Sequence, residues 1–258
     1  TDIVQPWIAA QLGEQFPGGS HALELSEDGE QMRLSYPSAL TERGDYLRDS
    51  VLLEFGGRNI IEPNEVHIVS PDIALGLDGL VFPEATVSVL SPALTFWEKA
   101  TLMHVECHRD SLRQNAERLS RHWYDLAMLA RHPIGVQAVT ERELLADVVK
   151  HKQVFYSAAY ARYEDCLVGR LRLVPDDKTL LALADDYRRM VDAGMFIGQP
   201  PSFADIVTEL RALELAINRL ASSKRQMGFT IFPPVFPISL HHQQPDSASA
   251  DASSEEPS

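Results

Sequence analysis

Glu54 is the first residue whose type and place could do chemistry. It stands in "VLLEFGGR", residues 51–58, within an apolar run typical of a central strand. A carboxylate in such a strand costs free energy unless it is paired, hydrogen-bonded or bound to a metal. The two glycines that follow allow close approach of another group, and Arg58 comes next. The alternative is that Glu54 ends the strand, where it is exposed or paired with Arg58.

Lys99 is the second candidate, in "LTFWEKATLMHVECHR", residues 94–109. Phe96, Ala100 and Met103 are spaced as the core-facing stripe of a helix, and Lys99 lies beside that stripe. A lysine at such a margin usually extends its ammonium group to solvent, and the spacing alone favours this interpretation. The alternative is an ammonium group that points into a cleft and binds phosphate as a compact point charge.

A third candidate stretch is "RLSRHWYDLAML", residues 118–129, in which Arg118 and Arg121 precede an aromatic pair and Asp125. We expect Asp125 in the opening turn of a helix, where the helix dipole stabilises a carboxylate whether or not it has a function. The basic residues beside it indicate either a phosphate site or a cluster of ion pairs.

Other patterns give weaker signals. His104 and His108 are four residues apart on one helix, but the order H-V-E-C-H lacks the glutamate position of a metalloprotease, and we expect no metal there. The stretch "PGGSHALELSED" resembles the start of a phosphate loop. Only seven residues separate Ser20 from Asp28, too few for the helix and strand that such a loop needs, so it predicts a turn before a hairpin.

Charge narrows the classes of partner. The net charge is −14, and the last eighteen residues hold four acids and no Lys or Arg, which leaves −10 for residues 1–240. Such a surface disfavours a broad DNA-binding face but leaves room for a small cationic pocket for a nucleotide or an RNA end. The sequence has no apolar run of the ~20 residues that cross a bilayer. It also shows no secretory signal, and its two cysteines are read as reduced thiols, so we expect a cytoplasmic protein without membrane contact.

Short strands and one helix are expected in residues 1–94. The helix covers residues 3–16, and Asp28-Gly29 predicts a hairpin. Residues 49–57 are nearly continuously apolar, which predicts a strand buried on both faces. After them, residues 57–84 read as a long irregular excursion before a further strand in "ATVSVLS".

From residue 95 to 225 the apolar period is helical, with caps expected at Thr140, at Asp176 or Asp177, and at Ser202. Residues 226–258 are proline-rich and then polar and acidic, a composition typical of a disordered tail. The predicted fold class is therefore α+β, with a small sheet followed by a helical region.

Three stretches together resemble the nucleotidyltransferase family of AbiEii/AbiGii toxins, the enzymatic half of bacterial abortive-infection toxin–antitoxin systems. They are "VLLEFGGRNIIEP", "VLSPALTFWEKATLMH" and "RLSRHWYDLAML". The resemblance implies a polymerase-β-like nucleotidyltransferase core in residues 1–94 and a helical C-terminal domain in 95–225. It also implies a nucleoside triphosphate and Mg²⁺, an acceptor such as the end of a tRNA, and an antitoxin as partner.

Residue by residue, the resemblance places the family's catalytic lysine at Lys99, its later aspartate at Asp125, and its strand acid, by a weaker match, at Glu54. Lys99, Arg58 and Arg121 would then contact the nucleotide. The family usually carries Arg-Asp or Lys-Asp before the aromatic pair, and here Arg121-His122 stands there. Because His122 stands where the family has this aspartate, no residue of this sequence is assigned the role of that aspartate.

A larger departure concerns the metal-binding acids. In this family a Gly-Gly-Ser/Thr loop and a D-x-D strand precede the first helix, and neither precedes residues 3–16 here. We therefore expect the chain to be the C-terminal part of a nucleotidyltransferase, inactive by itself. A sheet edge left open by the missing strands would favour a homo-oligomer.

Two rival functions remain open. The first is a non-catalytic binding module that holds an antitoxin or another protein with its helical half. The second is an unrelated hydrolase that uses Glu54 with His104 or His108.

Overall fold

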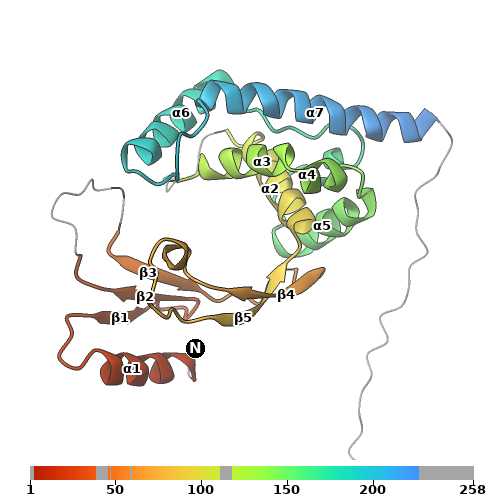
Figure 1. Ribbon diagram of the computed structural model, residues 1–258. Coiled ribbons are helices and arrows are strands. Elements are labelled where there is room, and N and C mark those ends of the chain that lie inside the picture. The colour runs from red at the N-terminus through yellow and green to blue at the C-terminus, as the bar shows by residue number, and fades with distance from the viewer. Residues whose placement is uncertain (1–2, 39–45, 47, 59, 111–117, 227–258) are drawn as a thin grey trace, which may run out of the picture.

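The computed structural model describes residues 3–38, 46, 48–58, 60–110 and 118–226. Two small antiparallel sheets and α1 form one half, and the helices α2–α7 form the other (Figure 1). The fold class is α+β, as predicted. No helix in the described part of the chain is long and apolar enough to span a bilayer. The predicted tail from 227 onward lies outside the described residues.

The first sheet is a three-stranded meander with the order β1-β2-β3. It comprises β1 (Ala22–Leu25), β2 (Gln31–Ser35) and β3 (Ser50–Glu54), and α1 (Val4–Gln15) lies next to it. The predicted hairpin is confirmed, because Gly29 has a φ of 70° in the turn between β1 and β2. Only glycine adopts that angle without strain. A strand, rather than a helix, follows Gly18-Gly19-Ser20, as the turn interpretation predicted.

The prediction that residues 49–57 form a strand buried on both faces is wrong. β3 is the edge strand of its sheet, and the side chains of Val51 and Leu52 are exposed. An apolar run does not show which layers cover a strand. β2 pairs along one edge of β3, and the exposed side chains of Val51 and Leu52 show that its two faces are not both covered by other layers.

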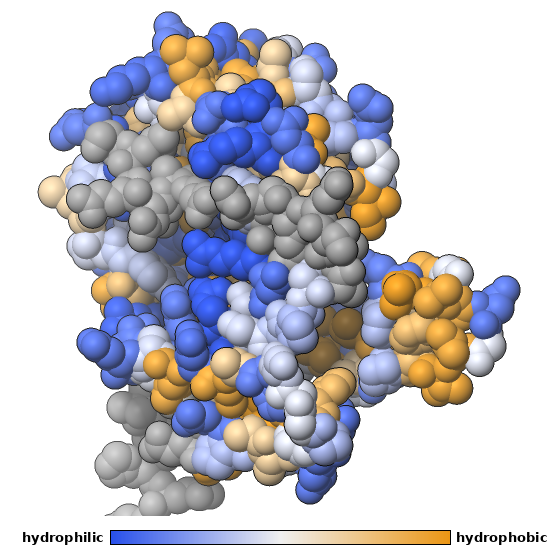
Figure 2. Space-filling model, turned by 90° about the vertical axis from the view of Figure 1, so that its left-hand side faces the viewer, coloured by the Kyte–Doolittle hydropathy of each residue, from blue (hydrophilic) through white to orange (hydrophobic). Residues whose placement is uncertain are grey.

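The second sheet corrects the expected irregular excursion. It pairs β4 (Asn64–Val69) with β5 (Ala85–Leu90), and a 3-10 turn, η1 (Asp72–Leu75), lies between them. None of the residues in these three elements is buried. We call residues 64–90 the apolar lobe. Figure 2 shows a largely hydrophobic projection at its right-hand edge, and the lobe carries exposed apolar side chains that include Ile68, Leu75 and Val81.

The helical half holds the core. Its helices are α2 (Pro92–Glu106), α3 (Arg121–Arg131), α4 (Pro133–Ala138), α5 (Arg142–Phe155), α6 (Asp177–Asp192) and α7 (Phe203–Gln226), with a 3-10 turn η2 (Tyr163–Cys166). Trp97 of α2 and Trp123 of α3 are fully buried, whereas Met32 is the buried residue in the described strands. The position of Lys99 and Asp125 is therefore set by the packed half of the molecule.

The predicted helix caps are confirmed at two sites and wrong at one. Asp176 accepts a hydrogen bond from the Thr179 amide, and Ser202 accepts one from the Asp205 amide. Thr140 does not cap α5. Its hydroxyl instead donates to the Gln137 carbonyl in the preceding helix, and α5 begins at Arg142, one residue later than a Thr140 cap predicts.

Candidate functional site

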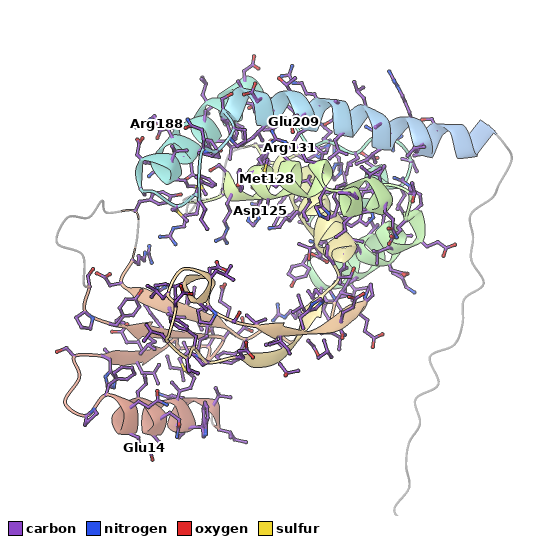
Figure 3. The ribbon with its side chains drawn as sticks, in the orientation of Figure 1. Glu14, Asp125, Met128, Arg131, Arg188 and Glu209 are labelled. Carbon is purple, nitrogen blue, oxygen red and sulfur yellow. The ribbon has the colours of Figure 1, made fainter. Side chains whose placement is uncertain are left out.

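Lys99 and Asp125 form an ion pair between two packed helices. The Nζ of Lys99 on α2 lies 2.7 Å from Oδ2 of Asp125 on α3, and the two side chains are 21% and 37% exposed. Both residues flank buried stripes, since Phe96 and Ala100 are buried on α2 and Leu126 is buried on α3. Asp125 lies on the side of α3 that faces the sheets (Figure 3). The structure therefore brings together the ammonium and the carboxylate that the sequence singled out.

Glu98, the neighbour of Lys99, turns to a different helix. Its Oε2 lies 2.7 Å from Nζ of Lys152 on α5, and Nζ also donates to the Glu98 carbonyl at 3.3 Å. Successive residues of a helix are about 100° apart around its axis. For this reason Glu98 faces α5 while Lys99 faces α3, and the adjacent charges do not neutralise each other. The interpretation of Lys99 as a solvated lysine is wrong.

The remaining predicted residues are exposed, and Arg121 lies one turn before Asp125 on α3. Glu54 is exposed at the end of β3, and its Oε1 accepts a hydrogen bond from Gln31 at 3.3 Å. Arg58 is exposed in the turn after β3, and Arg121 is exposed as the first residue of α3. Among the described residues no hydrogen bond or ion pair joins Glu54 to Lys99 or Asp125. Of the three acids and bases assigned by resemblance, two converge.

His104 has no nitrogen free for catalysis or metal binding. The Arg172 amide donates to its Nδ1 at 3.0 Å, so Nε2 carries the hydrogen and donates to the Arg162 carbonyl at 3.1 Å. Burial lowers the pKa of His104 to about 4. His108 donates from Nδ1 to the His104 carbonyl. These contacts argue against the hydrolase that was left open.

No cluster of three or more His, Cys, Asp or Glu side chains in the described part of the chain is placed to hold a metal ion. Asp125 is a single carboxylate already engaged by Lys99. Magnesium in proteins is held by one or two carboxylates together with substrate phosphates and waters. The described acids therefore do not form the metal site that the resemblance implies.

A family model for "Nucleotidyl transferase AbiEii toxin, Type IV TA system" matches residues 1–209. The chain belongs to the AbiEii family. This AbiEii chain is thus a nucleotidyltransferase toxin of a type IV toxin–antitoxin system. Membership of this family implies an antitoxin as partner and a nucleotide as substrate. Comparisons with curated proteins and with solved structures give no match.

Sequence reasoning missed three polar residues of this AbiEii chain that hold the helices in place. Lys152 is buried and pairs with the half-buried Glu98, and Asp186 is buried beside Tyr46, whose hydroxyl donates to it at 3.0 Å. The spacing of Asp186 could have indicated its burial, because Leu183 and Met190 lie three residues before and four after it on the same stripe. Tyr46 carries no comparable signal.

Proposed function

We propose that the intact enzyme containing this chain, with the metal-binding acids that the described residues lack, transfers a nucleotide from a nucleoside triphosphate to an acceptor, with the end of a tRNA as the leading candidate acceptor. Lys99 binds the triphosphate, and Asp125 positions Lys99 and assists the acceptor hydroxyl. The observation that carries the proposal is the 2.7 Å contact between Lys99 and Asp125 in a member of a nucleotidyltransferase family.

Nucleotide transfer depends mainly on positioning and on stabilising charge around the phosphates. The Lys99 ammonium has three donors, of which Asp125 takes one. The other two remain for phosphate oxygens, and the ion pair limits the directions in which they point. The ion pair uses Oδ2 of Asp125, so Oδ1 remains to accept the proton of the acceptor hydroxyl as that hydroxyl attacks the α-phosphate and pyrophosphate leaves. Arg58 and Arg121 are proposed to contact the nucleotide from the surface.

Magnesium remains an implication of the resemblance. When bound, it would neutralise charge on the triphosphate. The described residues do not supply its ligands, so no step is assigned to it.

The test is a transfer assay with labelled nucleoside triphosphates, magnesium and a tRNA pool, using the full-length protein. We expect Lys99→Ala and Asp125→Asn to abolish transfer while thermal unfolding stays cooperative and close to that of the wild type. Control substitutions at Arg188, an exposed residue that pairs with Asp185 and Asp192, should leave transfer unchanged. Undiminished transfer by Lys99→Ala would refute the proposal.

The apolar lobe favours a second candidate function, that of a protein-binding module. Ile68, Leu75 and Val81 are 70%, 93% and 100% exposed. A two-stranded hairpin is at best marginally stable alone, and large exposed apolar patches usually mark binding sites. No Lys or Arg occurs between Arg58 and Lys99, whereas five acids occur in residues 59–90. The lobe is thus suited to bind a partner protein whose surface is apolar and bordered by basic residues.

Cell growth separates the two functions. If catalysis causes toxicity, induced Lys99→Ala is harmless. If binding through the lobe causes toxicity, Lys99→Ala remains toxic and Leu75→Asp is harmless. Purified Leu75→Asp should keep its helical circular dichroism signal, because Leu75 is 93% exposed and belongs to no packed core.

A further inference from the structure

Asp186 of α6 is a buried carboxylate that joins three segments of the chain. It is 3% exposed, and its Oδ1 accepts hydrogen bonds from the Tyr46 hydroxyl at 3.0 Å and the Arg118 amide at 2.8 Å. Its Oδ2 accepts from the amide and the hydroxyl of Ser120, at 2.9 and 2.6 Å. All four neighbours are donors. A buried carboxylate with four donors stays where those donors hold it.

Two arginines complete the surroundings of Asp186. Arg189 Nη2 lies 3.6 Å from Oδ1, and the guanidinium groups of Arg118 and Arg189 lie 5.2 and 5.8 Å from the Tyr46 ring centre. Arg118 also donates to the Tyr46 carbonyl. Burial, and next the negative charge of Asp186, raise the pKa of Tyr46, so its hydroxyl remains a donor. The cluster therefore ties the segment before β3 to the helical half.

The same carboxylate fixes the start of α3. Ser120 precedes α3 with a helical backbone conformation, and its hydroxyl makes no capping bond to the helix but donates to Asp186. The Ser120 carbonyl accepts from the amides of Trp123 and Tyr124 and so begins the helix. Arg118 has a φ of 63°, a strained angle for a residue other than glycine. The hydrogen bond from the backbone amide of Arg118 to Asp186 holds that conformation.

We propose that Asp186 is a positioning residue for the nucleotide site: by fixing Arg118 and Ser120 it sets the first turns of α3 and places Asp125 against Lys99. Asp125 lies only four residues beyond the start of α3, so a shift of the first turn moves its carboxylate. The functional importance of that placement rests on the proposed function, whereas the placement itself can be measured without nucleotide.

The test substitutes Asp186→Asn, with Asp185→Asn as the matched control. An amide in either orientation presents its NH₂ to one backbone amide, whose contact is lost, and to one hydroxyl, which must turn to accept instead of donate. Asp185 precedes Asp186 in the helix, is 58% exposed and pairs with Arg188 and Arg189 on the surface. The readout is the Lys99 ammonium signal in a nitrogen-edited NMR spectrum, assigned by its loss in Lys99→Met.

We expect Asp186→Asn to move the Lys99 signal to the position found in Asp125→Asn, and Asp185→Asn to leave it at the wild-type position. An unchanged signal in a folded Asp186→Asn protein overturns the proposal. If Asp186→Asn does not fold, Ser120→Ala takes its place. This variant removes one of the four bonds and should shift the signal in the same direction; no shift would again overturn the inference.

A transfer assay then separates this inference from the proposed function. If both hold, Asp186→Asn lowers kcat at least tenfold while KM for the triphosphate changes little, because Lys99 is still present. A moved Lys99 signal with unaffected transfer would retain the positioning role and refute the catalytic role of the ion pair.

Discussion

Substitutions of Lys99, which pairs with Asp125, and of Lys152, which pairs with Glu98, should affect activity and stability differently. We consider Lys99→Met and Lys152→Met, in which methionine keeps the length of the apolar stem and removes the ammonium group. Lys99 and Asp125 are 21% and 37% exposed. Ion pairs so open to water contribute about 0–1 kcal/mol. A loss of that size lowers the melting temperature by about 2–4 °C at most for a domain of 150–250 residues.

Lys152 should behave differently. Its side chain is 9% exposed, and its removal leaves Glu98, 32% exposed, without its partner. Breaking a fully buried pair costs about 3–5 kcal/mol, and the exposure of Glu98 reduces the expected loss to about 2–3 kcal/mol. That loss corresponds to a melting temperature lower by about 5–10 °C.

Activity should change in the opposite order, with the larger loss in Lys99→Met and the smaller loss in Lys152→Met. Measured below both melting temperatures, transfer by Lys99→Met should fall by about 100-fold or more, the usual effect of removing one charge-stabilising donor. Transfer by Lys152→Met should stay within about tenfold of the wild type, since Lys152 faces α5 and not Asp125. Differential scanning calorimetry and the transfer assay give both quantities. If Lys99→Met loses as much stability as Lys152→Met, and activity merely follows stability, Lys99 is a structural lysine and the reasoning fails.

Three further predictions concern the rest of the molecule. Because burial lowers the pKa of His104 from 6.5 to about 4, the unfolded chain binds the proton first, and the free energy of unfolding falls as pH drops from about 6.5 to about 4. Urea unfolding should show up to about 3 kcal/mol of this loss; an equal loss in His104→Gln would contradict it. Gly135→Ala should destabilise by about 3 kcal/mol or more, because its Cβ would lie 2.0 Å from the Leu129 carbonyl oxygen, whereas Gly13→Ala meets nothing within 4 Å and should be neutral or stabilising in thermal melts. Sedimentation should show concentration-dependent self-association, because β3 is an edge strand with unpaired backbone groups; a constant monomer mass would count against it.

The sequence was sufficient for local features with a local cause. The Asp28-Gly29 hairpin and the Asp176 cap follow from the conformations that those residues prefer, and both are present. The change from strand to helical periods gave the α+β class. The family resemblance of the E-K and Y-D-L segments gave Lys99 and Asp125 as candidates, and the match over residues 1–209 confirms that resemblance. Their catalytic roles remain predictions.

Tertiary structure decided which candidates meet. The sequence left open whether Glu54 lies inside a buried strand or ends the strand, exposed; β3 is an edge strand, and Glu54 is its exposed last residue. A short apolar run has the same pattern in a central or an edge strand, because its neighbours come from elsewhere in the chain. Asp186 and Tyr46 are 140 residues apart. Their contact, like that of Lys99 with Asp125, exists because the helices pack at particular angles, which depend on side chains all along the interfaces and not on the spacing of any motif.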